Sequence, residues 1–136
     1  MRRVFKVRHF DRWMRKTTLT NRALCLAVAE MASGLIDADL GGGVFKKRVA
    51  LPGGGKRGGV RTLIATNRGD RWFFVFGFEK SERANVNATE EGALKTLAAD
   101  LLARTTAELD SEVSRRALVE ICHDEEGQEP NIGGGP

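Results

Sequence analysis

The chain of 136 residues contains no tyrosine, two histidines and two cysteines. The missing tyrosine excludes any mechanism that needs a phenol, and two cysteines are too few for a disulfide-rich scaffold. Neither Cys25 nor Cys122 lies in a CxxC motif, which excludes a zinc ribbon, so both are predicted to be reduced thiols, with Cys25 packed in a core. No apolar run reaches the roughly 18–20 residues of a membrane span, and no signal-peptide pattern follows the basic N-terminus. These absences favour a cytoplasmic protein with no membrane partner.

The positive charge is concentrated in the N-terminal part of the chain. Residues 1–83 contain 18 lysines and arginines against 7 aspartates and glutamates, whereas residues 84–136 contain 4 against 11, and the whole chain carries +4. A basic body indicates a polyanionic partner, most often a nucleic acid. A solvated charged surface is the alternative that charge alone leaves open.

Hydrophobic periodicity predicts an α+β domain. Alternation predicts a short strand over residues 4–9, followed by helical turns over 10–16. A helix is predicted over 20–33, with Leu24, Ala27, Val28, Met31 and Leu35 on its apolar face. Strands are expected at 44–51, 60–66 and 72–78, the last two as a hairpin, and helices from 89 to 102 and from 111 to 123. This order favours a small antiparallel sheet with helices packed on it, divided into a domain over 1–108 and an acidic C-terminal helix with a frayed tail over 109–136.

Two familiar kinds of site are not predicted. The glycine-rich segment 52–59 lacks the GxxxxGK[ST] pattern of a P-loop and precedes a strand instead of a helix. His9 and His123 have no partners at metal-ligand spacing, and Asp37 and Asp39 are expected to be turn and cap residues. We therefore expect neither a metal nor a cofactor.

What remains is a set of cations on the predicted sheet. On the strand at 44–51, Phe45, Val49 and Leu51 should face the core while Lys46 and Arg48 project together from the other face. Arg61 begins the next strand, and Lys80 and Arg83 follow the aromatic strand. If these strands are neighbours, their cations converge into one cleft. Such a cleft can stabilise charge on a reacting phosphate and, through a lysine, transfer protons, although a generic basic surface is the alternative.

Three runs of the sequence resemble a known family. They are LIDADLGGGVFKKRVA at 35–50, GGVRTLI at 58–64 and FGFEKSERAN at 76–85. In these runs the chain resembles the RelE/HigB-like toxins of type II toxin–antitoxin systems, and the likeness extends over about residues 4–104. The resemblance implies the RelE-like toxin fold.

The resemblance also implies an activity. Such toxins inhibit translation as metal-independent endoribonucleases, or mRNA interferases, that cleave mRNA on the translating ribosome when a 2′-hydroxyl attacks the adjacent phosphate. Carried over by motif, the catalytic residues are Lys46, Arg48, Arg61 and Lys80, and the RNA-binding residues are Lys47, Lys56, Arg57 and Arg83. Ser81 occupies a position that is basic in the family, and the family's C-terminal tyrosine is missing, so the general base and acid stay open.

The implied partners are mRNA, the ribosome and a cognate antitoxin, expected to be of helix-turn-helix type. Three alternatives remain open at this point. They are a ParE-like toxin directed at DNA gyrase, a non-catalytic RNA- or ribosome-binding module, and a small structural or interaction domain.

Overall fold

A computed structural model describes residues 1–53 and 58–123 of the chain. Within them, six strands form one sheet in the order β2-β3-β4-β5-β1-β6. The strands are β1 (Arg3–Val7), β2 (Ala38–Gly41), β3 (Val44–Val49), β4 (Val60–Thr66), β5 (Arg71–Glu79) and β6 (Leu118–Ile121). The helices are α1 (Arg8–Met14), α2 (Asn21–Ala32), α3 (Ala88–Leu102) and α4 (Thr106–Ser114). All strand pairs are antiparallel except β1 with β5, so the predicted α+β class is confirmed.

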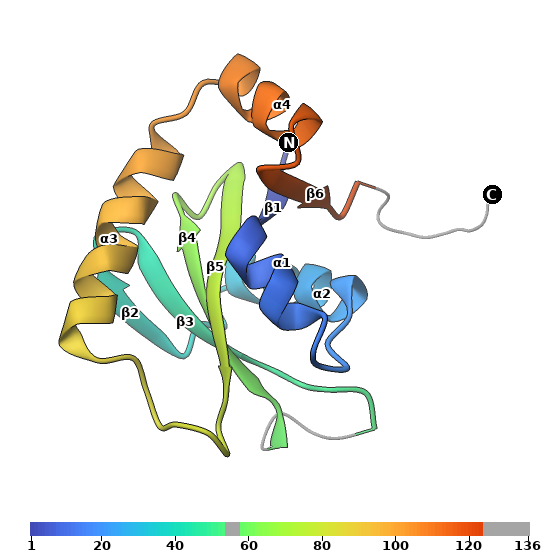
Figure 1. The fold of residues 1–136 in the computed structure, drawn as a ribbon, viewed down its shortest axis with the longest axis vertical. Coiled ribbons are helices and arrows are strands. Elements are labelled where there is room, and N and C mark those ends of the chain that lie inside the picture. The colour runs from blue at the N-terminus through green and yellow to red at the C-terminus, as the bar shows by residue number, and fades with distance from the viewer. Residues whose placement is uncertain (54–57, 124–136) are drawn as a thin grey trace.

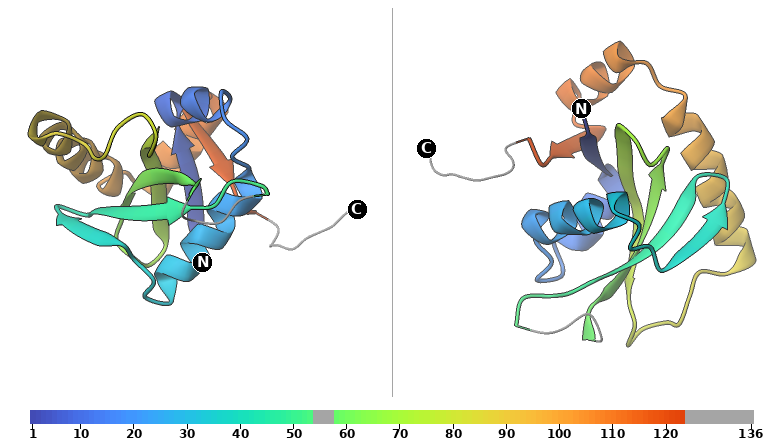
Figure 2. Two further views of the ribbon diagram at one scale, coloured as in Figure 1. Left: turned by 90° about the horizontal axis from the view of Figure 1, so that it is seen from below. Right: turned by 180° about the vertical axis from the view of Figure 1, so that it is seen from behind.

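The sheet is covered on both faces (Figures 1 and 2). Helices α1 and α2 pack on one face over a cluster that we call the α2-side core, which includes Phe10, Leu24, Met31, Phe45 and Trp72. Helices α3 and α4 pack on the other face over the α3-side core, which includes Phe5, Val44, Leu63, Phe73, Leu94 and Leu109. Because both faces are covered, β4 and β5 are buried along nearly their whole length, and β5 has no polar residue between Arg71 and Glu79.

Helix α2 forms where its pattern predicts. Thr20 is the N-cap, and its side chain accepts a hydrogen bond from the Ala23 N–H, which satisfies one of the free donors of the first turn. The predicted apolar face is buried at Leu24, Ala27, Val28 and Met31. Leu35 is an exception, because it lies beyond the helix and is 58% exposed.

Helix α3 also starts from a sequence-encoded cap. Asn87 and Glu90 form a capping box, in which each side chain accepts from the backbone N–H of the other residue. The helix predicted from residue 89 to 102 is confirmed, and its apolar residues Leu94, Ala98 and Leu101 lie at helical spacing and are buried in the α3-side core. Helix α3 runs along the sheet and packs over β4, with β3 and β5 beside it (Figure 1).

Three expectations about secondary structure are wrong. The strand predicted at 4–9 ends at Val7, where α1 begins. The predicted break at 40–43 instead contains part of β2, which pairs with β3 through a hairpin whose Gly41, Gly42 and Gly43 all have positive φ. The helix predicted over 111–123 does not form as such, because α4 ends at Ser114 and Arg116 has a φ of 64°.

Residues 118–121 instead form β6, an edge strand antiparallel to β1. Leu118 and Ile121 are buried in opposite cores, and the guanidinium of Arg3 donates two hydrogen bonds of 2.8 Å to the Glu120 carboxylate. The sheet therefore continues beyond residue 108. A division of the chain into domains at that residue stays a prediction.

The expectation that the cysteines are reduced is wrong in this structure. Cys25 of α2 and Cys122, directly after β6, form a disulfide between residues separated by 97 positions. The bond connects the outermost strand of the sheet to the helix that covers the α2-side core. None of the helices in the described part of the chain combines the length and hydropathy needed to cross a lipid bilayer.

Candidate functional site

The cations predicted on β3 and β4 lie together on one face of the sheet. In the antiparallel β3–β4 pair, Arg48 lies directly opposite Arg61, and Lys46 lies opposite Leu63. Residues directly opposite each other share a face, and so do alternate residues of one strand. Lys46, Arg48 and Arg61 therefore project on the same side, which is the side of the α3-side core. The convergence predicted from the strand period is present for these three residues.

Arg61 is held in an unusual electrostatic position. Its Nη1 atom is buried and has no hydrogen-bond partner among the described residues. An unsatisfied buried donor costs about 1–3 kcal/mol. A second cation directly across the strand pair adds a further unfavourable interaction. Both costs would be relieved by an anion that accepts from Arg61 and Arg48 together.

The neighbouring cations differ in how they are held. The Arg48 side chain is 49% exposed, and its Nε lies 3.5 Å from a carboxylate oxygen of Asp37, while the other oxygen of Asp37 accepts from the Arg48 backbone N–H at 2.6 Å. Lys46 lies between Ala38 on β2 and Leu63 on β4 and is half-buried. No ion pair or hydrogen bond holds its ammonium within residues 1–53 and 58–123.

Lys80 lies in the exposed turn after β5, one residue beyond Glu79, which is opposite Val60. It therefore lies at the end of the sheet where β4 begins, two rows beyond the Arg61–Phe78 pair. Its ammonium also has no partner in the part of the chain that the structure describes. Lys80 is free to reach toward the cation pair or away from it.

Arg83 is fixed against the same end of the sheet. Its guanidinium lies 5.9 Å and 5.6 Å from the ring centroids of Phe76 and Phe78, and Phe78 is directly opposite Arg61. It donates two hydrogen bonds to Glu90 in the first turn of α3, one of them at 3.0 Å. The hydrogen bond from Arg83 holds the pKa of Glu90 below its usual value of 4.5. Cation–π contact and a charged pair thus fix the position of Arg83 before any ligand binds.

Lys47 does not belong to this exposed set. It points to the opposite face, is 3% exposed, and its ammonium contacts Glu30 of α2 at 3.0 Å and the Leu35 carbonyl at 2.8 Å. The expected role in holding RNA does not fit this placement, because both its charge and its donors are used inside the α2 side of the fold. Lys56 and Arg57 lie outside the described residues.

An aromatic pocket, which the sequence does not predict, lies beside the cation cluster. The His9 ring, at the start of α1, stacks on Phe76 of β5 with ring centroids 5.9 Å apart. These two residues, with Trp13 and Arg83, line a pocket of about 430 Å³ between α1 and β5. Nothing in the local pattern of residues 4–16 signals this contact, because it depends on where α1 packs against the far half of β5.

The groups in this cluster favour one class of ligand. It offers several cationic donors on one face, flanking aromatic rings and a buried guanidinium N–H that is unpaired in the described part of the chain. Together these groups suit a phosphate-containing ligand with bases. Among the described residues, no group of three His, Cys, Asp or Glu side chains is placed to hold a metal ion.

Comparison with known proteins agrees with the likeness seen in the sequence. A family model described as the RelE toxin of the RelE / RelB toxin–antitoxin system matches residues 2–121. No curated protein matches the chain. The family match extends through β6, so it covers both the cation cluster and the last strand of the sheet.

Proposed function

Because this chain belongs to the RelE toxin family, we propose that it is the toxin of a type II toxin–antitoxin system and an endoribonuclease that cleaves mRNA on the translating ribosome. The observation that carries the proposal is the Arg48–Arg61 pair, in which the buried Nη1 of Arg61 has no hydrogen-bond partner within residues 1–53 and 58–123. A buried donor without a partner, beside a second cation, lowers the stability of the folded protein, and an anion bound there would recover that free energy. In RNA the matching anion is the scissile phosphate.

The reaction needs no group beyond the RNA and the side chains. The substrate's 2′-oxygen forms a bond to the adjacent phosphorus, the bond to the 5′-oxygen breaks, and the products carry a 2′,3′-cyclic phosphate and a 5′-hydroxyl. One proton leaves the 2′-hydroxyl and one is delivered to the 5′-oxygen. Negative charge grows on the phosphorane oxygens between these events, and fixed cations on the sheet face stabilise it.

We assign roles by position. Arg61 neutralises the scissile phosphate, since it lies opposite Arg48 and its buried Nη1 has no hydrogen-bond partner among the described residues. Lys46, two residues from Arg48 on the same face, accepts the 2′-hydroxyl proton or stabilises its developing charge. Arg48 and Lys80 stabilise the transition state or assist the departing 5′-oxygen, and Arg83 holds RNA backbone beside the two phenylalanine rings.

The family also supports a cognate antitoxin as partner. We propose that this antitoxin is of helix-turn-helix type and that the toxin acts in the cytoplasm, where translating ribosomes supply its substrate.

Primer extension on mRNA in a purified translation system tests the proposal. Wild-type protein should create new 5′ ends at the ribosomal A site. Arg61→Ala should lower the cleavage rate by about 100- to 1,000-fold, the usual effect of removing one donor that stabilises transition-state charge. Arg22→Gln, at an exposed position on α2, is the matched control and should cleave like wild type.

Two other outcomes would contradict the proposed nuclease activity, and a third would contradict the role of Arg61. Intact mRNA together with inhibited DNA gyrase supercoiling would select a ParE-like toxin. Salt-dependent binding of RNA or ribosomes without cleavage would select a non-catalytic binding module. Full activity of Arg61→Ala would remove Arg61 from the mechanism.

A further inference from the structure

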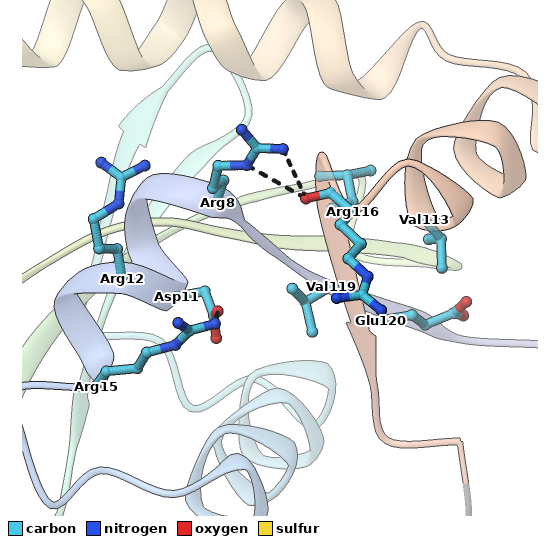
Figure 3. Close-up of a pocket in the computed structure, with 9 residues that line it drawn as sticks. Arg8, Asp11, Arg12, Arg15, Val113, Arg116, Val119 and Glu120 are labelled. Carbon is cyan, nitrogen blue, oxygen red and sulfur yellow. Dashed lines mark hydrogen bonds and ion pairs between the residues drawn. The ribbon is translucent and has the colours of Figure 1, made fainter.

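A second basic surface lies at the other end of the sheet, beside β6. One wall is α1, which contributes Arg8, Arg12 and Arg15, and the other is formed by Arg116 and Val119 at and before β6 (Figure 3). We call this surface the arginine cleft. Its volume is about 580 Å³, within the range of clefts that hold ligands. Two strands, β5 and β1, separate β6 from β4 and its Arg61.

The carboxylates of the arginine cleft do not neutralise it. Asp11 contacts the buried Lys6 at 2.7 Å and Arg15 at 2.8 Å. Burial by itself would raise the pKa of Asp11, but the hydrogen bonds and charges of Lys6 and Arg15 outweigh it and lower that pKa. Glu120, the other acidic residue of the lining, is already paired with the guanidinium of Arg3 at 2.8 Å.

The other arginines of the cleft form few hydrogen bonds or ion pairs with the described residues. Arg8 donates two long hydrogen bonds of 3.4 Å to the Arg116 backbone carbonyl (Figure 3). Within the described ranges, neither Arg12 nor Arg116 forms an ion pair or a side-chain hydrogen bond. All three are exposed. The cleft thus presents guanidinium groups on both walls whose donors are available to an anion.

The spacing of these groups suits a polymer with repeated charges. Arg8, Arg12 and Arg15 follow one another at intervals of four and three residues, which places them along one side of α1 and its C-terminal end. The planar fork of a guanidinium matches the oxygens of a phosphate, and a row of forks matches successive phosphates.

The adjoining pocket favours RNA over an acidic peptide as the occupant. Arg12 lines both the arginine cleft and the aromatic pocket in which His9 stacks on Phe76. That pocket adds Lys16 and Arg83 to the basic surface. Aromatic faces beside cations bind unstacked bases, whereas a peptide of carboxylates gains nothing from them. The basic surface is therefore continuous from β6 around α1 to the side of β5 that carries Phe76.

We propose that the arginine cleft binds RNA phosphates outside the cleavage site and that the aromatic pocket between α1 and β5 takes a base of the same strand. This inference rests on the proposed function in one respect, namely that the substrate is RNA. In this proposal, α1 binds the part of the RNA that extends beyond the scissile bond.

Fluorescence anisotropy with an end-labelled, fully 2′-O-methylated 20-nucleotide RNA tests the cleft directly. The methyl groups block the attacking hydroxyl, so binding is measured without cleavage. Two full-length variants are compared with wild type at several salt concentrations: Arg12→Gln/Arg116→Gln, which alters the cleft, and Arg22→Gln, which removes an exposed arginine elsewhere. Thermal unfolding checks that all three proteins are equally folded, which is expected because the altered side chains are exposed.

If the cleft binds phosphate, the double variant should bind this RNA at least 10-fold more weakly than Arg22→Gln. The slope of log affinity against log salt should also fall by about 1.4, which is the loss of two single-strand phosphate contacts. Equal affinity and slope in the two variants would overturn the inference. So would tighter binding of labelled polyglutamate than of RNA through the same two arginines, since the occupant would then be an acidic peptide.

The two proposals fail in different ways. Cleavage of mRNA by the wild type, together with unchanged RNA binding in the double variant, would overturn the cleft and leave the proposed function intact. Arginine-dependent RNA binding by a protein that leaves mRNA uncut would support the cleft and overturn the proposed nuclease.

Discussion

Opening the disulfide between Cys25 and Cys122 should cost this protein a large part of its stability. The bond joins residues 97 positions apart, so it restricts most of the unfolded chain. In the chain-entropy treatment, closing a loop of about 100 residues stabilises the folded state by about 4.7 kcal/mol. Most domains have a total unfolding free energy of only about 5–15 kcal/mol.

The location of the bond adds a local effect. β6 has four residues and, in the described part of the sheet, a single strand neighbour, so few hydrogen bonds hold it. The disulfide connects the residue after β6 to α2, which packs on the α2-side core. Without it, Ile121 at the end of β6 should separate from that core before the rest of the sheet opens.

Urea unfolding followed by tryptophan fluorescence measures the effect, since Trp72 is fully buried and hydrogen-bonded to the Gly69 carbonyl. The variant Cys25→Ser/Cys122→Ser should unfold at a urea concentration lower by about 2 M, for a typical slope of about 2 kcal/mol per molar. Dithiothreitol should produce a similar shift in the wild type and none in the double variant. Wild-type stability that changes by less than about 1 kcal/mol on reduction would refute the chain-entropy reasoning.

Four further predictions concern packing and charge. Gly77→Ala should lower the unfolding free energy by about 1–3 kcal/mol, because a Cβ there would overlap the ring of Trp13 in α1. Gly92→Ala, in open space on α3, should raise the unfolding free energy by about 0.5–1 kcal/mol in the same denaturation assay. Lys47→Met should cost about 1–3 kcal/mol in urea unfolding yet leave mRNA cleavage within two-fold of wild type. Contact with Arg83 lowers the pKa of Glu90, so the stability from this pair should be complete above pH 4.5 and decline as the pH falls through the lower folded pKa. Arg83→Gln should flatten that decline when the unfolding free energy is measured at a series of acid pH values. An unchanged dependence on pH would contradict the prediction.

The disulfide also bears on where the protein works. Cytoplasmic thiols are kept reduced by glutathione and thioredoxin systems. If the toxin acts there, as we propose, its working form is the reduced one, and its stability in cells should match that of the double serine variant in vitro.

Local patterns in the sequence predict the elements that depend on local physics. Helices α2 and α3 follow from apolar residues at helical spacing and from caps that the chain encodes at Thr20 and Asn87. The β4–β5 hairpin follows from two apolar runs around a polar turn. Placing Lys46 and Arg48 on one face follows from the two-residue period of a strand.

Other elements form only because of distant partners. Val113, Ala117 and Ile121 have helical spacing, yet residues 118–121 form a strand because β1, more than 100 residues earlier, offers an open edge. A strand of four residues has too few side chains to show a reliable period, so pairing decides its conformation.

The functional site shows the same division. Composition and strand period alone place basic residues on the sheet and indicate a polyanionic partner. The strand period places Lys46 and Lys47 on opposite faces, but it does not show that the charge of Lys47 is used inside the fold, because that follows only when α2 covers one face and its Glu30 contacts the Lys47 ammonium. Likewise, the burial of the Arg61 Nη1 and the arginine cleft exist only once strands and helices far apart in the chain are packed together. Local sequence therefore sets the charge and the periodic elements, whereas long-range packing selects which of the charges stay available to a ligand.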